Sequence, residues 1–535
     1  MYLTTALAAL LYSTGVFCLE EPVVDLGHSQ YRGNRLPSGI DEYLGVPYAA
    51  PPVGDLRFRA PRDPVGAPEV QDTTEFRRPC VGVGQNVSVE FAEDCLYMNV
   101  FTPSNATAQS KLPVWVHIQG GGYAWNSNAN FNGSKVIQES GFDVVYVAFN
   151  YRVGALGFLA SERVRQDGDL NVGLLDQRKA LFWIKEHIQQ FGGDPGHVVI
   201  HGDSAGAGSI AHHMTAYGGR DDRLFMGAVY ESPFWPTLRT VSEMEFQFDR
   251  FVGDAGCSDA ESPMECLRAA DLDRLLKANV VSSFPGAEGL LLPYWYFLPV
   301  IDGDLIQDQL YTLFSQGKSL NMPLLVGDDT NEGTEFVNNA STPAEMASFL
   351  KANYPHLQPA SLKAIQRAYP LMPPVPNHNA YFPSVAAAYG DATFTCPGNF
   401  ITMSMAERND SDSKVWNYRY NVRAPALMAA GVGVPHVFEM SAIFGVGYAG
   451  NEKTTSYNTV NKAVVPIVMD YWISFVKYLD PNVARNRNAP EWGRWGSGDG
   501  KRLKIETNAT SMEPVSSMLT EHCALWKALG AEMEL

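Results

Sequence analysis

Short apolar runs rich in β-branched residues recur along the chain and alternate with stretches of helical spacing. Runs that are apolar at nearly every position are typical of strands buried on both faces, as in a parallel sheet covered by helices. One intervening stretch, Asp176–Gln190, has helical spacing and is followed by a Gly-Gly-Asp-Pro break, which marks a crossover helix. The strand candidates are Pro113–Ile118, Val144–Phe149, Val198–His201, Phe225–Tyr230, Pro323–Val326 and Val415–Tyr420. This alternation predicts an α/β fold with a large, mostly parallel sheet and helices on both faces.

Two long stretches interrupt the alternation, at about residues 232–320 and 342–395. They contain helix-like and proline-rich sequence, such as Pro370–Pro376, and we expect them to form helical insertions above the sheet. The chain has no internal repeat, low-complexity tract or flexible linker that would separate a second folding unit. Residues 19–535 are therefore predicted to form a single domain.

The N-terminal sequence indicates where the protein is located, and the overall charge argues against one class of partner. Leu3–Phe17 is an apolar run, and Val16 and Cys18 are small enough to flank a signal-peptidase cut, so residues 1–18 are predicted to be a signal peptide. Because the run is shorter than a membrane span, we expect a secreted protein with no stable membrane anchor. The net charge of −18 and the lack of a basic run argue against a nucleic-acid partner.

The cysteines fit an oxidising compartment, because the chain has seven and removal of Cys18 leaves an even number. Proximity in sequence suggests the pairs Cys80–Cys95 and Cys257–Cys266, with Cys396–Cys523 as the remaining pair, although other connectivities stay open. No CxxC motif is present, and we expect no metal. Candidate N-glycosylation sites lie at Asn86, Asn105, Asn132, Asn339, Asn409 and Asn508.

A candidate nucleophile lies where the strand Val198–His201 runs into Gly202-Asp203-Ser204-Ala205-Gly206 and then into a predicted helix, Ala207–Met214. A serine on such a sharp strand-to-helix turn projects its hydroxyl group outward, and the flanking glycines leave room for the turn. The GxSxG pattern also arises by chance, so the surrounding strand and helix carry the prediction. The amide of Ala205 would lie at a helix N-terminus, where partial positive charge favours a developing oxyanion.

A glycine run, Gln119-Gly120-Gly121-Gly122-Tyr123, follows the strand Pro113–Ile118. Such a run can turn its backbone N–H groups inward, and with Ala205 the amides of Gly121 and Gly122 are predicted to form an oxyanion hole. A flexible turn and a phosphate-binding loop are the alternatives. The run lacks the GK[ST] ending of a P-loop, which favours the oxyanion hole.

These motifs resemble those of the type-B carboxylesterase/lipase family, the cholinesterase-like α/β-hydrolases. The block Glu93-Asp94-Cys95-Leu96-Tyr97-Met98-Asn99-Val100 matches the second signature of that family, and the Gly-Asp-Ser-Ala-Gly block around Ser204 matches its active-site signature. Further agreement is found in the blocks Tyr43–Ala49, Asn150–Gly154 and Asn171–Arg178. The resemblance runs from about residue 41 to residue 523. It implies an α/β-hydrolase fold, a serine ester hydrolase that needs no cofactor, and the three disulfides suggested above.

Eleven histidines compete to be the base for Ser204. His117 and His201 lie within predicted strands, so we expect them to be packed or hydrogen-bonded core residues. His436 lies in a glycine-rich loop after the strand Val415–Tyr420, and on chemistry alone a loop histidine is more often structural. The Val-Pro-His sequence that ends at His436 matches the histidine block of the family, and the resemblance therefore implies that His436 is the base.

The acid is expected in the segment that follows the strand Pro323–Val326, because the order serine, acid, histidine is that of the α/β-hydrolase fold. This segment offers several carboxylates, and chemistry alone does not choose among them. The family places its acid before a Gly-Thr pair, which implies Glu332, with Asp328 and Asp329 as weaker alternatives. A carboxylate there would fix the tautomer of the imidazole and stabilise its cation.

Departures from the family bear on the substrate, which we expect to be a small-molecule ester. The Cys80–Cys95 interval is short and contains no tryptophan, which argues against a lipase-like lid and against choline esters. Aromatic residues in two segments match regions that line the family's pocket, although each is as well explained by core packing. The candidate pocket residues are Trp235, Tyr294, Trp295, Tyr296 and Phe297.

Soluble esters with aromatic or short-to-medium acyl groups are therefore the predicted substrates. A lipase that acts on long-chain acylglycerols is the alternative within the same class. A catalytically silent adhesion protein is the alternative from another class, since the scaffold also serves as a binding module. Ser204, Glu332 and His436 are all present, which disfavours the adhesion hypothesis.

Overall fold

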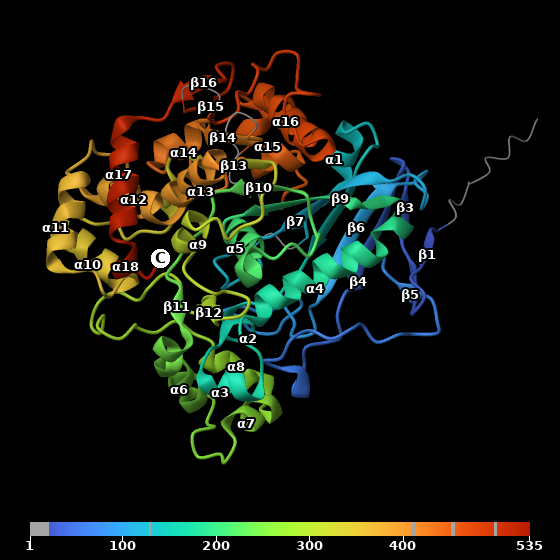
Figure 1. Ribbon diagram of the computed structural model, residues 1–535, viewed down its shortest axis with the longest axis horizontal. Helices are drawn as coiled ribbons and strands as arrows, with labels where there is room; N and C mark the ends of the chain where they lie inside the picture. The colour runs from blue at the N-terminus through green and yellow to red at the C-terminus, as the bar shows by residue number, and fades with distance from the viewer. Residues whose placement is uncertain (1–20, 128–129, 409–412, 451–454, 497–499) are drawn as a thin grey trace, which may run out of the picture.

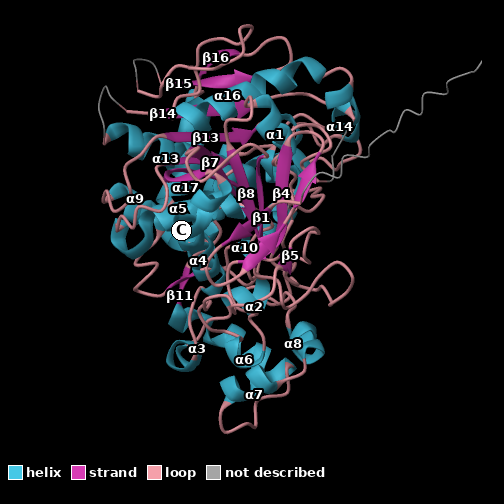
Figure 2. Ribbon diagram, turned by 90° about the vertical axis from the view of Figure 1, so that its right-hand side faces the viewer, coloured by secondary structure: helices cyan, strands magenta, loops and turns pink. Residues whose placement is uncertain are grey.

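An 11-stranded sheet runs through the middle of the molecule (Figures 1 and 2). This computed structural model describes residues 21–127, 130–408, 413–450, 455–496 and 500–535. The predicted signal peptide, residues 1–18, and the candidate glycosylation site Asn409 lie outside the described residues. The strands of the sheet are β3 (Asn34–Leu36), β4 (Ile40–Pro47), β6 (Tyr97–Pro103), β7 (Leu112–Ile118), β8 (Val145–Phe149), β9 (Gly193–Asp203), β10 (Gly227–Glu231), β13 (Leu324–Asp329), β14 (Val415–Tyr420), β15 (Lys501–Ile505) and β16 (Ser511–Pro514).

The strand order is β16-β15-β14-β13-β10-β9-β7-β8-β6-β4-β3. From β15 across to β8, neighbouring strands are parallel, whereas β3, β4 and β6 at one edge and β16 at the other are antiparallel to their neighbours. The predicted α/β fold with a mostly parallel sheet is therefore confirmed. The carboxyl ends of β7, β9, β10 and β13 lie at one edge of the sheet, which is where the predicted site residues follow.

All of the predicted strands are present, as β7, β8, β9, β10, β13 and β14, with shifted ends. The antiparallel edge strands were not predicted from apolar runs. In β15, which lies next to the edge strand β16, the sequence Lys-Arg-Leu-Lys-Ile mixes charged and apolar residues, and Lys501 is exposed whereas Leu503 and Ile505 are buried. Smaller strands outside the main sheet are β1 (Val23–Asp25), β2 (Gln30–Arg32), β5 (Gln71–Asp72), β11 (Arg239–Thr240) and β12 (Val300–Ile301).

Both faces of the sheet are buried against helices. In β7, Val114, Val116 and Ile118 belong to one hydrophobic core and Trp115 to the other, as expected for a strand covered on both sides. The first core includes α2 (Gly154–Phe158), α4 (Val172–His187), α5 (Ala205–Gly219) and α13 (Cys396–Glu407). The second core includes α1 (Ser134–Glu139), α15 (Met440–Phe444) and α16 (Val465–Tyr478).

The insertions are helical, as predicted. Three of their helices gather at the bottom of Figure 1 and others at its left-hand side, beside the C-terminal helices. The first group is α6 (Glu245–Asp254), α7 (Pro263–Ala269) and α8 (Leu272–Ala278). The second group is α10 (Pro343–Asn353), α11 (Pro359–Ala368), α12 (Phe382–Gly390), α17 (Ser517–Ala528) and α18 (Gly530–Met533). The remaining helices are α3 (Glu162–Asp167), α9 (Leu310–Ser315) and α14 (Pro425–Ala430).

Three disulfides join cysteines of the described residues. They join Cys80 to Cys95, Cys257 to Cys266, and Cys396 to Cys523, which are the pairs that the sequence suggested. The last pair links α13, which packs on the sheet, to α17 near the C-terminus. It closes the longest loop of the three, and cross-links of that kind reduce the entropy of the unfolded chain most.

Candidate active site

Ser204 joins β9 to α5 in a strained backbone conformation, with φ 54° and ψ −122°. Residues other than glycine rarely adopt positive φ, and such strain concentrates at functional sites. Two glycines make the turn sterically feasible. A Cβ on Gly202 would lie 2.4 Å from the carbonyl carbon of Gly206, and a Cβ on Gly206 would lie 1.9 Å from the carbonyl oxygen of Ile118. The GxSxG sequence therefore folds into the tight turn that it predicted.

The oxyanion loop, residues Gln119–Tyr123, turns sharply after β7 and lies beside Ser204. Gly121 and Gly122 have φ values of 107° and 61°. Within the described part of the chain, the amides of these two glycines donate no hydrogen bond. Ala205 is the first residue of α5, where the N–H group has no acceptor within the helix. Three N–H groups at the end of β7 and the start of α5 are thus available to hold an oxygen.

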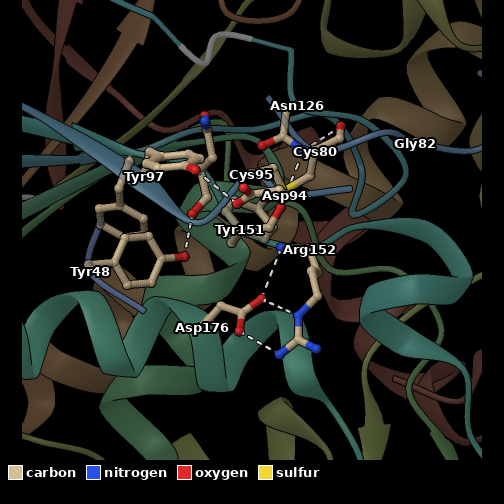
Figure 3. Close-up of a disulfide and its surroundings, with 12 residues drawn as sticks. Tyr48, Cys80, Gly82, Asp94, Cys95, Tyr97, Asn126, Tyr151, Arg152 and Asp176 are labelled. Atoms are coloured by element: carbon tan, nitrogen blue, oxygen red, sulfur yellow. Dashed lines mark hydrogen bonds and ion pairs between the residues drawn. A yellow bond between two sulfur atoms is a disulfide. The ribbon is translucent and has the colours of Figure 1, made fainter. Parts of the chain in front are cut away.

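Asn126 and Tyr151 hold the first residue of the oxyanion loop. The side-chain amide of Gln119 donates to Oδ1 of Asn126 at 2.6 Å, and the hydroxyl of Tyr151 donates to the backbone oxygen of Gln119 at 2.9 Å. Asn126 also donates to the backbone oxygen of Cys80, so the Cys80–Cys95 disulfide and the oxyanion loop share an anchor (Figure 3). The loop is therefore positioned by side chains as well as by its own turn.

Glu332 and His436 contact each other although they are far apart in sequence. Oε2 of Glu332 lies 2.5 Å from Nδ1 of His436, and both side chains are almost fully buried. The other carboxylate oxygen, Oε1, accepts hydrogen bonds from the hydroxyl of Ser232 at 2.7 Å and from the amide of Asp329 at 2.6 Å. These two donors fix the carboxylate, and the carboxylate in turn fixes the orientation of the imidazole.

Hydrogen bonds between neighbouring strand ends connect Ser204 to Glu332. The amide of Ser204 donates to the backbone oxygen of Glu231 at 2.8 Å, and the amide of Ser232 donates to the backbone oxygen of Gly327 at 2.8 Å. Since the hydroxyl of Ser232 reaches Glu332, the ends of β9, β10 and β13 form one continuous frame. Sequence reasoning did not identify this contact.

Aromatic rings surround the imidazole of His436. The ring of Phe394 lies 4.3 Å from it and the ring of Phe336 5.0 Å, measured between centroids. Phe234 packs against Phe394, and its amide donates to the backbone oxygen of Ser204. Phe394 lies in a π-helical turn, Asp391–Thr395, of a kind that is frequent at functional sites. Sequence reasoning did not name these phenylalanines, and Phe394 carries no local signal that would have found it.

Two of the predicted pocket residues, Trp295 and Tyr294, contact the aromatic rings near His436, which together form an aromatic wall. Trp295 lies 5.2 Å from the ring of Phe234, and its ring covers Gly122, where a Cβ would lie 2.0 Å from it. Tyr294 contacts both Trp295 and Phe336. Tyr296, Phe297 and Trp235 pack elsewhere: the first two against Phe284 and Phe251 in the α6–α8 region, and Trp235 against Tyr311.

Asp328 and Asp329, the alternative acids, have other partners. Asp328 faces Arg502 at 3.4 Å, and burial raises the pKa of its carboxyl group from 3.8 to about 7. Asp329 accepts a hydrogen bond from the amide of Phe438 at 3.1 Å, and burial beside Glu439 raises its pKa well above the usual value. Among these carboxylates, the contact with His436 is made by Glu332.

The described residues lack both a metal-binding cluster and a membrane-spanning helix. No group of histidine, cysteine and carboxylate side chains among them has an arrangement that would hold a metal ion. No helix among them has the length and apolar character needed to cross a membrane.

A strained serine at the end of a central strand, amides beside it that donate no hydrogen bond within the described chain, and a buried histidine–carboxylate contact lie together at one edge of a sheet of the α/β-hydrolase fold. The chain belongs to the carboxylesterase family, whose model matches residues 20–526. EstA from Aspergillus niger is 55% identical, with a TM-score of 0.94 over 96% of this chain and 99% of that one. The chain is therefore a carboxylic-ester hydrolase, and the predicted family membership and enzyme class are confirmed.

Fungal lipases are among its curated relatives. Lipase 2 of Geotrichum candidum is 30% identical over 550 residues, which cover 93% of each chain. Secreted lipase 1 of Botryotinia fuckeliana is 31% identical over 505 residues, which cover 86% of this chain and 84% of the relative. The hypothesis of a catalytically silent adhesion protein finds no support among these relatives.

Proposed function

We propose that this ester hydrolase works through an acyl-enzyme formed on Ser204. The hydroxyl of Ser204 attacks the ester carbonyl carbon while Nε2 of His436 accepts its proton, and His436 then donates that proton to the departing alcohol. Water, deprotonated by the same imidazole, attacks the acyl-enzyme and releases the acid. Glu332 keeps the imidazole in the tautomer whose Nε2 carries no proton and can accept one, and it stabilises the imidazolium that forms.

The negative oxygen of each tetrahedral intermediate is assigned to the amides of Gly121, Gly122 and Ala205. Among the described residues these groups have no acceptor, and one of them starts a helix whose dipole favours negative charge. Each such donor typically contributes about 3–4 kcal/mol to the lowering of the barrier. The observation that carries the whole assignment is the contact of 2.5 Å between His436 and Glu332, because a buried, oriented imidazole is what an acyl-transfer mechanism requires.

Soluble esters with aromatic or short-to-medium acyl groups are the proposed substrates. The rings of Phe234, Trp295, Phe336 and Phe394 offer an apolar, close-walled site for such a group. Residues 81–94, between the first pair of disulfide-bonded cysteines, contain no helix that would act as an amphipathic lid. We further propose that residues 19–535 form one domain and that the protein is secreted after removal of residues 1–18, in keeping with its three disulfides.

Hydrolysis of long-chain acylglycerols is the second candidate, because two relatives that align with most of this chain are named lipases. The two candidates differ in their response to an interface. A lipase gains activity when its substrate forms an emulsion, whereas an esterase without a lid saturates with the soluble monomer.

One experiment tests both parts of the proposal. Turnover of p-nitrophenyl esters from acetate to palmitate, together with a triglyceride emulsion, is measured for the wild-type enzyme and for Ser204→Ala. We expect the highest kcat/KM for the shorter esters, no gain from the emulsion, and loss of turnover in the alanine variant. Full activity of Ser204→Ala would reject the nucleophile, and strong interfacial activation would replace the esterase assignment with the lipase one.

A further inference from the structure

Four ionisable side chains lie together on the face of the sheet that α5 does not cover. They are His117 on β7, His201 and Asp203 on β9, and Glu231 on β10. The two histidines are register partners across β7 and β9, and the two carboxylates are register partners across β9 and β10. Nε2 of His117 lies 3.1 Å from Oδ1 of Asp203, and Nε2 of His201 lies 2.8 Å from Oε1 of Glu231. The sheet therefore holds two parallel histidine–carboxylate pairs.

The surroundings of these pairs are apolar. His117 stacks on the ring of Phe131 at 4.9 Å, and His201 stacks on the ring of Phe444 at 5.3 Å. The side chains of both pairs are at most 1% exposed to solvent. Moving such groups out of water is costly, and the neighbouring helices α1, α15 and α16 bring mainly hydrophobic side chains to this face. The cost of burying these four groups calls for a role beyond packing. One of them, Asp203, directly precedes Ser204 and is therefore close to the candidate site.

Asp203 is the member that reaches the oxyanion loop. The same oxygen that contacts His117, Oδ1, accepts a hydrogen bond from the amide of Gly120 at 3.2 Å. Gly120 has no room for a side chain, because a Cβ would lie 2.7 Å from Oδ2 of Asp203 and 2.8 Å from Cβ of Ser204. One carboxylate oxygen thus ties the loop to the residue that precedes the nucleophile.

His117 fixes that oxygen. Within the described chain, Nδ1 of His117 has no hydrogen-bond partner. The ring proton that makes a hydrogen bond is therefore the one on Nε2, which points at Asp203. The stack on Phe131 and an edge contact with Phe444 hold the ring in place. The chain of contacts is therefore His117 to Asp203, Asp203 to Gly120, and along the backbone from Gly120 to Gly121 and Gly122.

We propose that His117 is a positioning residue for ester hydrolysis: through Asp203 it holds the oxyanion loop at the correct distance from Ser204. The inference rests on the proposed function, since it assumes that Ser204 is the nucleophile and that Gly121 and Gly122 bind the oxyanion. His117 touches no reacting atom. Its effect is on the geometry that is needed once negative charge develops in the transition state.

The second pair provides a matched control. His201 and Glu231 are again a buried histidine and a buried carboxylate, at the neighbouring register position, with Nε2 of His201 close to Glu231 but in no hydrogen bond within the described chain. The indole of Trp115 donates to Nδ1 of His201, and the indole of Trp472 donates to Oε1 of Glu231, so tryptophans of the hydrophobic core anchor this pair. Loss of His201 disturbs packing to a similar degree as loss of His117 but leaves the contact between Asp203 and Gly120 in place.

Two substitutions separate the hydrogen bond of His117 from its ring. His117→Phe keeps a ring for the stack but has no donor, whereas His117→Gln keeps an N–H donor near the position of Nε2. We expect His117→Phe to lower kcat about 10–100-fold with little change in KM, because a misplaced catalytic group costs about that much. His117→Gln and His201→Phe are expected to stay close to wild type in kcat. Active-site titration with an organophosphonate normalises each rate to the folded, reactive enzyme.

A trifluoromethyl ketone supplies a readout that a purely structural role would not move. This inhibitor adds to the serine and forms an oxyanion in the hole, so its Ki is expected to rise in His117→Phe by the same factor as kcat falls. If His117→Phe does not fold, Asp203→Ala takes its place, since it removes the link itself and predicts the same rise in Ki.

Three results would overturn the proposal: an unchanged kcat and Ki in His117→Phe, equal losses in His117→Phe and His117→Gln, or equal losses in His117→Phe and His201→Phe. In the last two cases the ring or the packing is responsible, and the hydrogen bond to Asp203 is not. Phosphonate labelling of Ser204 in the wild-type enzyme tests the proposed function separately. A failure of that labelling is distinguishable from an unchanged rate in the His117 variants.

Discussion

At the scale of single residues, the contact between Glu332 and His436 bears the most on function. Replacing Glu332 by Gln keeps the size of the side chain but puts an amide where the imidazole N–H needs a carboxylate, which favours the wrong tautomer. We expect kcat to fall about 10³–10⁴-fold with KM nearly unchanged, as for the acid of other serine triads. Asp328→Asn, a substitution of a buried carboxylate in the same segment, is the control and should keep most of the activity. Equal losses in the two variants would contradict the assignment.

Asp328 itself predicts how stability depends on pH. Burial raises its pKa from 3.8 to about 7, so the folded protein retains a proton that the unfolded chain has already lost above about pH 4. Stability from this group is full below about pH 4 and falls as the pH rises to about 7, by at most about 4 kcal/mol. Asparagine does not titrate, so Asp328→Asn removes this pH dependence. The melting temperature of the variant should therefore rise relative to that of the wild type as the pH increases over this range. Scanning fluorimetry at intervals from pH 4 to pH 8 measures the difference, and a flat difference would show that Asp328 does not titrate there.

At the scale of elements, the loop after β7 works only if glycine occupies two consecutive positions. Gly122 has φ 61°, and a Cβ there would lie 2.0 Å from the ring of Trp295. We expect Gly122→Ala to lower kcat/KM by about 10²–10³-fold, the cost of an oxyanion donor, because either the ring or the amide must move. The double variant Gly122→Ala with Trp295→Ala removes the clash and should recover part of the loss. No recovery would mean that the backbone strain, and not Trp295, displaces the amide.

The elements also show which parts of the molecule the sequence predicts. Strands buried on both faces, such as β7 and β9, are apolar at nearly every position, so they and the Ser204 turn between β9 and α5 were identified from local pattern. The aromatic residues around His436 were not identified from local pattern. Phe394 meets His436 only because a π-helical turn in a distant insertion brings it there, and no local pattern encodes that contact. Of the consecutive aromatics at 294–297, the first two contact Phe336, whereas Tyr296 and Phe297 pack against Phe284 and Phe251, and no local pattern separates these two pairs.

At the scale of the whole molecule, the fold divides the candidate glycosylation sites into two classes. Asn86, Asn105 and Asn508 are exposed on the surface. Asn339 is exposed as well, whereas Asn132 is half-buried and its side-chain oxygen accepts a hydrogen bond from the amide of Ser134. N-glycans are attached to surface loops of secreted proteins, and a large hydrophilic group on a half-buried asparagine would have to displace packed neighbours.

We therefore expect the secreted enzyme to carry glycans at Asn86, Asn105, Asn339 and Asn508 and to lack one at Asn132. Because glycans are added before folding is complete, chains modified at this half-buried position would fold poorly and be removed before secretion. Enzymatic release of the glycans in ¹⁸O-labelled water marks each occupied asparagine, and peptide mass spectrometry of the protein from the culture medium then reads the pattern. High occupancy at Asn132 in the secreted protein would contradict this prediction, because it would show that a glycan is accommodated at a half-buried position.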